Sequence, residues 1–463
     1  MSPLARILAL SLAVLLAGCA IGPNYRRPVA PSAAAYKELD GWKPSEPADI
    51  LAHGPWWQIF NDQVLDDLEN EIDISNQNVL AAADAAEEAR ALVREAEASF
   101  WPLLSVNAGA THTVTAGGPG VNLKSAGASV DWDIDIWGKI RRTVESEKAS
   151  AEASAAALAN ARLTAQADLA TDYFELRGQD QLQILLAKTV AADETALKIT
   201  QARYKAGVAY QADILSAQTE LETAQAQAVN AQILRGTLEH AIAVLIGKPP
   251  VGLSLQPEPL ASTIPTVPPG VPSTLLERRP DIAQAEREVA AANAQIGVAI
   301  SAFFPDLTLS GSDAYDGMRF GKLIRASNQI WSLGPSLALT LFNGGLRRAE
   351  LAQVRASYRE SVASYRQTVL SDFEQVEDDL VSLRVLEKQA TLEQSLVTAA
   401  EQDAVLTINQ YKAGTVPYSS VITVQTTQLS AEETALSVRI DRFTSSIALI
   451  QALGGGWNAS QLK

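Results

Sequence analysis

The pattern of apolar and polar positions predicts an amphipathic helix followed by two strands. Residues 62–98 place apolar side chains at helical spacing, and the run ends before a proline. From residue 103 the apolar positions recur at every second residue, and over 126–137 apolar and polar residues alternate. Glycine and proline at 115–120 separate the two stretches. Residues 103–113 and 126–137 are therefore predicted to form a β-hairpin.

Two very long helices are predicted after the alternating stretches. Residues 139–204 and 344–411 are rich in Ala, Glu, Gln, Arg and Leu and contain no proline. At 1.5 Å per residue, about 65 helical residues reach roughly 100 Å, several times the length of a typical helix. Gly178 marks a candidate break in the first helix. Gly207 and Gly414 follow the last lysine of each stretch and suit left-handed C-caps, after which the chain returns as another helix.

The sequence also repeats itself with a period of roughly 205 residues, which suits two copies of a domain-sized unit. Four landmarks recur in order: Phe100-Trp101-Pro102 as Phe303-Phe304-Pro305, Gly138-Lys139-Ile140-Arg141-Arg142 as Gly344-Gly345-Leu346-Arg347-Arg348, Arg203-Tyr204-Lys205-Ala206-Gly207 as Gln410-Tyr411-Lys412-Ala413-Gly414, and Leu245-Ile246-Gly247 as Ala452-Leu453-Gly454. In the second copy, strands are predicted at about 306–315 and 330–342.

The N-terminus has the pattern of an exported lipoprotein. Arg6 precedes an apolar run that is too short for a membrane anchor, so residues 1–18 are predicted to be a signal peptide. Small residues precede Cys19, the only cysteine, and resemble a lipobox; Cys19 is then the lipid-bearing first residue of the mature chain. An ordinary signal peptide with a chance cysteine is the alternative. No intramolecular disulfide can form.

Charge and hydropathy restrict the partners. With 37 basic and 53 acidic residues the net charge is −16, which argues against nucleic acid and anionic membrane surfaces as partners. After the signal peptide, no apolar stretch reaches the roughly 20 residues that a membrane helix needs. Any membrane-spanning part would therefore be built from strands.

The four predicted strands have two interpretations. They are either half-buried hairpins that cover the helices of a soluble domain, or tilted transmembrane strands of about 9–11 residues. Export with a lipid anchor and aromatic residues at the strand ends, such as Trp101, Trp137 and Phe342, favour the membrane. Four strands cannot close a barrel, so several chains must share one, and three chains supply twelve strands.

No catalytic or metal-binding constellation stands out. His53, His112 and His240 fall in different elements without a carboxylate or cysteine cluster at ligand spacing. The chain is therefore predicted not to be an enzyme and to hold no metal and no cofactor besides the lipid on Cys19. A passive conduit is the leading function. A periplasmic coiled-coil scaffold without a pore, or a duct for protein or metal-ion export, are the alternatives.

Three motifs resemble those of a known family over nearly the whole mature chain. They are Gly22-Pro23-Asn24-Tyr25-Arg26-Arg27-Pro28, Trp56-Trp57-Gln58-Ile59-Phe60-Asn61-Asp62, and Arg278-Arg279-Pro280-Asp281-Ile282-Ala283-Gln284-Ala285-Glu286. With them the chain resembles the outer-membrane factors typified by TolC and OprM, and among these the NodT-type lipoproteins of resistance-nodulation-division (RND) efflux systems.

The resemblance implies a mainly α fold with a β-barrel part in the outer membrane of a Gram-negative bacterium. Three copies would form a twelve-stranded barrel, four strands per chain, continuous with a long α-helical periplasmic barrel. The expected partners are a periplasmic adaptor (membrane fusion protein), an inner-membrane pump of the RND type, and outer-membrane lipid, with no nucleic acid. The expected organisation is a signal peptide (1–18), a lipid-anchored extended segment (19–60), a first repeat (61–250), a Pro-rich linker (251–280), a second repeat (281–456) and a C-terminal tail (457–463).

Functional residues are also implied by the resemblance. The adaptor would contact the two hairpin tips, and its candidate contacts are Gly207, Ala209, Asp213, Leu215, Gln218, Gly414, Thr415 and Gln425. The periplasmic gate candidates are Tyr411, Val416, Ser420 and Thr423. Tyr411 matches a tyrosine of the family's constriction, but the arginine and aspartates that often accompany it are absent from the second tip. Closure is therefore expected to depend on packing more than on charge-assisted bonds.

Three aspartates are candidates for the lumen of the barrel. Asp131, Asp133 and Asp135 alternate with Val130, Trp132 and Ile134, which would face lipid. The aspartates either favour cations or only form a solvated polar face.

Overall fold

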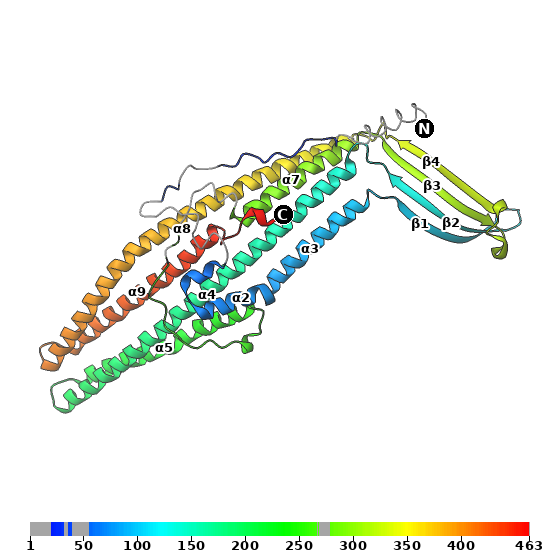
Figure 1. Cartoon of the computed structure of the whole chain (residues 1–463). Coiled ribbons are helices and arrows are strands. Elements are labelled where there is room, and N and C mark those ends of the chain that lie inside the picture. Colours follow the sequence, from blue (N-terminus) through cyan, green and yellow to red (C-terminus); the bar gives the residue numbers. More distant parts are fainter. Residues whose placement is uncertain (1–19, 32–35, 39–54, 266, 268–277, 463) are drawn as a thin grey trace. The chain divides into compact units, whose positions relative to one another are not determined.

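The computed structural model describes residues 20–31, 36–38, 55–265, 267 and 278–462, which form long helices and one four-stranded sheet (Figure 1). This confirms the predicted fold class, mainly helical with a β part. The predicted signal peptide, Cys19 and part of the predicted linker lie outside the described residues. The elements are η2 (Trp56–Phe60), α2 (Gln63–Ser75), α3 (Gln77–Ala98), β1 (Leu103–Thr113), β2 (Val121–Asp133), α4 (Lys139–Lys205), α5 (Gln211–Leu245), η3 (Pro250–Gly252), α7 (Pro280–Ser301), β3 (Asp306–Gly317), η5 (Phe320–Lys322), η6 (Ala326–Asn328), β4 (Gln329–Ala338), α8 (Leu346–Ala413), α9 (Tyr418–Ala452) and η7 (Ala459–Leu462).

The chain divides into two compact units. Unit 1 holds the sheet and the helical residues within 84–155 and 282–368, together with the described N-terminal residues up to 30. Unit 2 holds the described residues within 31–83, 156–281 and 369–462. The helices α4 and α8 contribute residues to both units.

The order and length of the elements confirm the two tandem repeats. α3 and α7 have 22 residues each, α4 and α8 have 67 and 68, and α5 and α9 have 35 each. A strand pair stands between the short and the long helix of each copy. The shared sequence landmarks therefore correspond to shared elements in the same order.

The sheet is antiparallel in the order β1-β2-β3-β4 and has two chemically distinct faces. Cross-strand partners share a face, so Leu104, Val130 and Leu333 belong to the apolar one. Serines pair in the same way on the polar face, where Ser129 lies opposite Ser312. Leu104, Val106 and Leu333 are 72%, 82% and 68% exposed. The apolar face of this sheet is thus uncovered in the single chain.

Two strands, β2 and β4, differ from the sequence prediction. β2 runs over Val121–Asp133 rather than 126–137, because β1 extends to Thr113 and pairs it with Val121. Its C-terminal end comes early because the carboxylate of Asp135 accepts hydrogen bonds from the backbone of α4. β4 ends at Ala338 rather than 342, because Ala338 pairs with Asp306, the first residue of β3.

Two helix boundaries also differ from the prediction. The single helix expected at 62–98 is divided at Asn76, whose side chain accepts hydrogen bonds from the N–H groups of Asn78 (2.9 Å) and Val79 (3.0 Å) and so caps α3. The break expected at Gly178 is absent, since α4 is continuous there. A Cβ at Gly178 would lie 2.3 Å from Cδ1 of Ile440, so this glycine permits close packing against α9.

Each repeat is tied together where it begins and ends. In the first closure, Ser75 Oγ donates to the carbonyl of Ile246 and Asn76 Nδ2 to that of Leu245, each at 2.7 Å. In the second closure, Arg279 Nη1 donates to the carbonyl of Ala452 at 3.0 Å. The guanidinium of Arg279 also pairs with Asp372 of α8 at 2.9 Å. The motif that begins the second repeat in the sequence is thus a structural clamp.

The core of unit 2 collects aromatic residues from both repeats. Trp56 is 1% exposed, and the rings of Phe174 and Phe443 stack with centroids 4.5 Å apart. Asp62 caps α2 and accepts a hydrogen bond of 2.7 Å from the Tyr173 hydroxyl. The aromatic motif before the first helix therefore anchors the chain in this core.

In unit 1, residues 20–24 lie along the first turns of α4 and along α7. The N–H of Ile21 donates to the carbonyl of Trp137 at 3.0 Å. Arg142 donates to the carbonyls of Ile21 and Gly22 and to the side-chain oxygen of Asn24. The buried Arg142 side chain thus fixes the segment that follows Cys19 in the sequence.

Candidate functional site: the tips of the two helical hairpins

Both hairpins of unit 2 turn at a glycine in the left-handed conformation. Gly207 has a φ of 76° and Gly414 a φ of 83°. The N–H of Val208 donates to the carbonyl of Arg203 and the N–H of Thr415 to that of Gln410, each at 3.0 Å. These bonds satisfy carbonyls that the ends of α4 and α8 would otherwise leave unpaired.

The next helices begin in different ways. The carboxylate of Asp213 accepts the N–H of Tyr210 at 3.0 Å and caps α5. At the second tip, α9 begins directly after Pro417, whose carbonyl accepts the N–H of Ser420. Asp213, predicted as an adaptor contact, therefore also has a structural role in the first tip.

A small core joins the two hairpins near their tips. We call it the tip core; its buried members are Ala217, Tyr411, Tyr418 and Val421. The rings of Tyr411 and Tyr418 have centroids 5.3 Å apart. Since Ala217 belongs to α5 and the other three to α8 and α9, the tip core packs the first hairpin against the second.

Polar bonds from α4 reinforce this packing at Tyr411. Arg203 Nη1 donates to the carbonyls of Tyr411 (2.7 Å) and Lys412 (3.1 Å). The guanidinium carbon lies 4.6 Å from the centroid of the Tyr411 ring, at cation–π distance. The Tyr411 hydroxyl lies 3.1 Å from Thr200 Oγ1. A charged group of the first hairpin thus holds the tyrosine of the second.

Arg203 and Thr200 are functional candidates that the sequence reasoning missed. The resemblance implies an arginine beside Tyr411 in the second tip, whereas the structure supplies one from the first. The duplication carries a signal for it, because Arg203 stands at the position of Gln410, beside the matched tyrosines. The tip thus holds hydrogen bonds from a charged side chain beside its apolar packing, and closure that depends more on packing than on such bonds stays a prediction.

The four predicted gate residues differ in burial. Tyr411 is 5% exposed, and Val416 packs against the tip core. Ser420 is half-buried, and Thr423 is exposed and donates its hydroxyl to the Ser419 carbonyl of its own helix. Of the four, only Tyr411 belongs to the tip core, and only Val416 packs against it.

The predicted adaptor contacts are mostly accessible. Leu215 is 57% exposed, and Gln218 is exposed with its amide bonded to Glu222. Gly207, Gly414 and Thr415 are also exposed, while Ala209 is half-buried.

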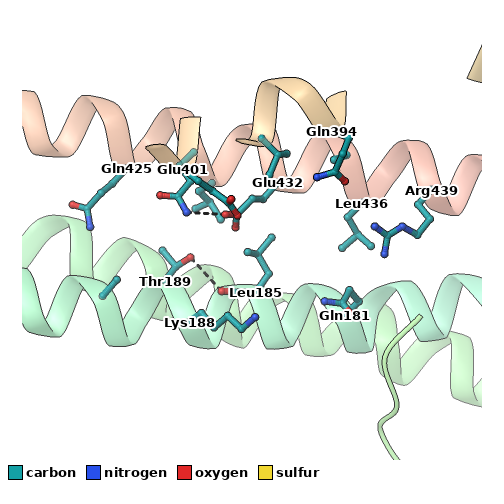
Figure 2. Close-up of a pocket in the computed structure, with 15 residues that line it drawn as sticks. Gln181, Leu185, Lys188, Thr189, Gln394, Glu401, Gln425, Glu432, Leu436 and Arg439 are labelled. Carbon is teal, nitrogen blue, oxygen red and sulfur yellow. Dashed lines mark hydrogen bonds between the residues drawn. The ribbon is translucent and has the colours of Figure 1, made fainter. Parts of the chain in front are cut away.

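Gln425 lines a groove above the second tip. The groove has a cavity volume of about 480 Å³ and lies between α4 on one side and α8 and α9 on the other (Figure 2). Its lining is rich in glutamine and includes the charged residues Lys188, Glu401, Glu432 and Arg439. Gln428 donates to Glu432 at 2.7 Å. Of the adaptor contacts predicted from the sequence, only Gln425 is among the residues that line it.

Asp131 and Asp133 lie on the polar face of the sheet, while Asp135 does not belong to a strand. Asp131 accepts the hydroxyl of Ser310 (2.8 Å) and Asp133 that of Thr308 (3.0 Å). Asp135 follows β2, accepts the N–H groups of Ile140 and Arg141, and pairs with the Arg141 side chain at 3.1 Å. Asp135 therefore caps α4, which differs from the predicted lumen position.

Among the residues that the structure describes, no three His, Cys, Asp or Glu side chains are grouped so as to hold a metal ion. No described helix is both long and apolar enough to cross a membrane.

Comparisons with known proteins agree on one group. The profile of the family described as outer membrane efflux protein matches residues 68–248 and 271–455. The chain is 30% identical over 461 residues to the probable efflux pump outer membrane protein TtgC of Pseudomonas putida, covering 97% of this chain and 95% of that protein. It is 30% identical over 426 residues to the pyoverdine export outer membrane protein OpmQ of Pseudomonas aeruginosa, covering 88% of each.

Solved structures show the same fold. The outer-membrane channel OprN is 28% identical and superposes with a TM-score of 0.87, covering 95% of this chain and all of that one. The outer membrane protein VceC of Vibrio cholerae is 26% identical, with a TM-score of 0.81 over 87% of this chain and 98% of that one.

Proposed function

This chain belongs to the outer membrane efflux protein family, and from that premise we propose that three copies form a duct for small solutes. Membership confirms the predicted function as an outer-membrane efflux channel and the predicted location in the outer membrane, extending into the periplasm. The number of copies, the partners and the lipid anchor are our proposals.

The observation that carries the trimer is the sheet with one exposed apolar face and two edges. Within the described residues, β1 pairs only with β2 and β4 only with β3. Exposed sheet edges and a bare apolar face favour aggregation in water and leave backbone groups unsatisfied in lipid. Three copies joined edge to edge would supply twelve strands, with lipid against the apolar face.

Adjacent positions on β4 test this proposal. Leu333 belongs to the apolar face, whereas Ser332 belongs to the polar face and contacts Ser312 at 2.8 Å. An arginine in lipid costs about 2–4 kcal/mol at mid-membrane, so Leu333→Arg should impair insertion. The matched Ser332→Arg should insert and change conductance. Equal insertion of both variants, measured by membrane fractionation and unheated gel mobility, would reject the membrane assignment.

The same preparations separate the duct from a scaffold. Wild-type protein in a planar bilayer should give single-channel conductance and migrate as a trimer before heating. A periplasmic coiled-coil scaffold should do neither. If the protein conducts and also transports proteins or metal ions, the alternative function, a duct for protein or metal-ion export, is favoured instead.

We propose that the tips receive a periplasmic adaptor that links the duct to an inner-membrane pump of the RND type. The exposed apolar residues Val208, Tyr210 and Leu215 (61%, 80% and 57%) support a protein contact at the first tip. The glutamine-rich groove beside Gln425 would accept a polar helical hairpin (Figure 2). Tyr210→Ser combined with Leu215→Ser should weaken co-purification of the adaptor without changing conductance.

We propose that contacts of Arg203 and Thr200 with Tyr411 hold the entrance closed. The support is the set of bonds between hairpins at the tip core. Tyr411→Ala should therefore raise conductance in bilayers, and an unchanged conductance would count against a gate there.

We also propose that acyl chains on Cys19 add attachment but are not essential. The segment from Ala20 to Asn24 is fixed on unit 1 by Arg142 and Trp137 without any lipid. A Cys19→Ala chain behind a cleavable signal should still reach the membrane and conduct. Its complete release as a soluble periplasmic protein would contradict the duct.

A further inference from the structure

The connection between β3 and β4 concentrates positive charge on a strongly acidic chain. Residues 317–328, which we call the basic connection, contain Arg319, Lys322 and Arg325 and no acidic residue, whereas the whole chain has a net charge of −16. The β1–β2 connection at 114–120 contains no charged residue. Both connections lie at the end of the sheet away from α7 (Figure 1). The basic residues are therefore gathered on one connection of this end.

The basic connection is held in a defined shape. Leu323 is 3% exposed and anchors its centre. Asn328 Nδ2 donates to the carbonyls of Lys322 (2.8 Å) and Leu323 (3.0 Å). The N–H of Lys322 donates to the carbonyl of Arg319 (3.2 Å). These bonds fix the spacing of the three basic residues through the backbone.

The cationic side chains themselves remain uncompensated. Arg319, Lys322 and Arg325 are exposed, and their side chains make no ion pair with any residue that the structure describes. Met318 and Ile324 stand beside them and are 71% and 77% exposed. Surfaces that bind anionic lipid headgroups combine cationic with exposed apolar side chains. The apolar groups enter the boundary between headgroups and acyl chains, while the cations contact phosphate.

At the opposite end of the sheet the strands themselves carry aspartates. Asp131, Asp133 and Asp306 lie there, close to the start of α4. The β3–β4 pair therefore carries Asp306 at its end beside the helices and the basic connection at its other end. Of the two connections at that other end, only the basic one is complementary to phosphate.

We propose that the basic connection binds the phosphate groups of lipid headgroups in the outer leaflet. This inference rests on the proposed function, which places the sheet in the membrane with this end outward. In the trimer, three such connections surround the outer mouth and hold the rim of the sheet at the headgroup level. The contact is local, so it is compatible with the acidic charge of the rest of the chain.

Native mass spectrometry of the full-length trimer in detergent tests the inference. The probes are lipid A carrying two phosphates and the same lipid with both phosphates removed. Arg319→Gln/Lys322→Gln/Arg325→Gln should bind the phosphorylated lipid about tenfold or more weakly than wild type. Lys139→Gln/Arg347→Gln/Arg348→Gln removes the same charge at the helical end and should bind as wild type. The dephosphorylated lipid should bind all three proteins weakly.

A second measurement needs no variant. Retention of the phosphorylated lipid by the wild-type trimer should fall as salt rises from about 0.05 to about 0.5 M, because the contact is electrostatic. Retention that does not change with salt would overturn the inference.

Conductance recorded on the same preparations separates the two proposals. A conducting wild type whose lipid binding survives the triple substitution, or is lost equally in the control, overturns the phosphate contact and leaves the duct standing. A triple variant that changes ion selectivity with unchanged lipid binding also overturns it, since the charges then act on passing solutes. A wild type that forms trimers but never conducts overturns the duct and this inference together.

Discussion

Tyr204 and Tyr411 occupy the same position in the two hairpins, yet their surroundings differ. Both precede Lys-Ala-Gly and a left-handed glycine turn. Tyr204 is 45% exposed, whereas Tyr411 is 5% exposed and packs against Tyr418. The residue before each explains part of the difference, because Arg203 reaches across to Tyr411 while Gln410 is exposed.

The same glycine turn is surrounded by exposed side chains in one hairpin and by buried ones in the other. The first tip exposes Val208 and Tyr210 to potential partners. The second tip buries Tyr418 and Val421 against the first hairpin. Both turns share the left-handed glycine, so the residues around it make the first tip exposed and the second buried against its neighbour.

The largest expected effect comes from truncating the two matched tyrosines. Tyr411→Ala removes a buried ring, and such truncations cost about 3–5 kcal/mol. Tyr204→Ala removes a half-exposed ring and should cost well under about 1 kcal/mol. Hydrogen exchange of residues 405–421 should accelerate strongly in the first variant only. Equal acceleration in both would show that the tips are not different in kind.

The bond between the hairpins should have a smaller but measurable effect. Arg203→Gln, which copies the residue of the second repeat, loses two hydrogen bonds and the ring contact and should cost about 1–3 kcal/mol. Lys205→Gln removes the same charge from an exposed site in the same turn and serves as control. In a double-mutant cycle with Tyr411→Ala, additive effects would mean that Arg203 does not act through this tyrosine.

The pH should act on the tip through Asp193 of α4. Burial, assisted by the charge of Glu220, raises the pKa of Asp193 to about 6. Because the pKa of this carboxyl is higher in the folded than in the unfolded state, its protonation stabilises the folded state. This stabilisation is complete below pH about 4, the unfolded pKa, and is lost as the pH rises through about 6. Protection factors near Tyr418, which correct for the pH dependence of intrinsic amide exchange, should therefore be higher at pH 5 than at pH 7.5, and Asp193→Asn should remove most of the difference. Glu194→Gln, at an exposed neighbour, should leave the difference intact.

The smallest stability effect is expected at the first tip. Tyr210→Ser changes a side chain that is 80% exposed and should alter the free energy of unfolding by no more than about 0.5 kcal/mol. Urea unfolding in detergent measures this directly. A loss comparable to that of Arg203→Gln would mean that the first tip also packs against its neighbour.

Local patterns in the sequence predict β1 and the hairpin turns well. The alternation over 103–113 matches β1 because both strand faces keep their character along its length. The first residues of β2 are not predicted, because Asn122 and Lys124 lie on the otherwise apolar face and interrupt the alternation there. The break between α2 and α3 at Asn76 is not predicted, because an asparagine within an apolar helical run does not mark a boundary by itself. Its hydrogen bond to Leu245, 169 residues away, is what makes the break useful.

The tip core is predicted only in part, since it depends on contacts between the repeats. Tyr411 is found through resemblance, and Gly207 and Gly414 through turn chemistry. Arg203 is missed because nothing local in the first hairpin shows that its side chain meets the second. Asp135 is misplaced because periodicity alone does not distinguish the end of a strand from the cap of the next helix.

The two closures join the beginning of each repeat to its end by hydrogen bonds, although the two are far apart in the sequence. Arg279 reaches Ala452 across 173 positions, and Asn76 reaches Leu245 across 169. Chains whose ends meet tolerate circular permutation, and a gene segment encoding such a repeat can be copied in tandem without redesign of its borders. A permuted chain cut in the exposed turn at Gly207 should therefore keep its fold more readily than one cut at Asn76, where the repeat is closed.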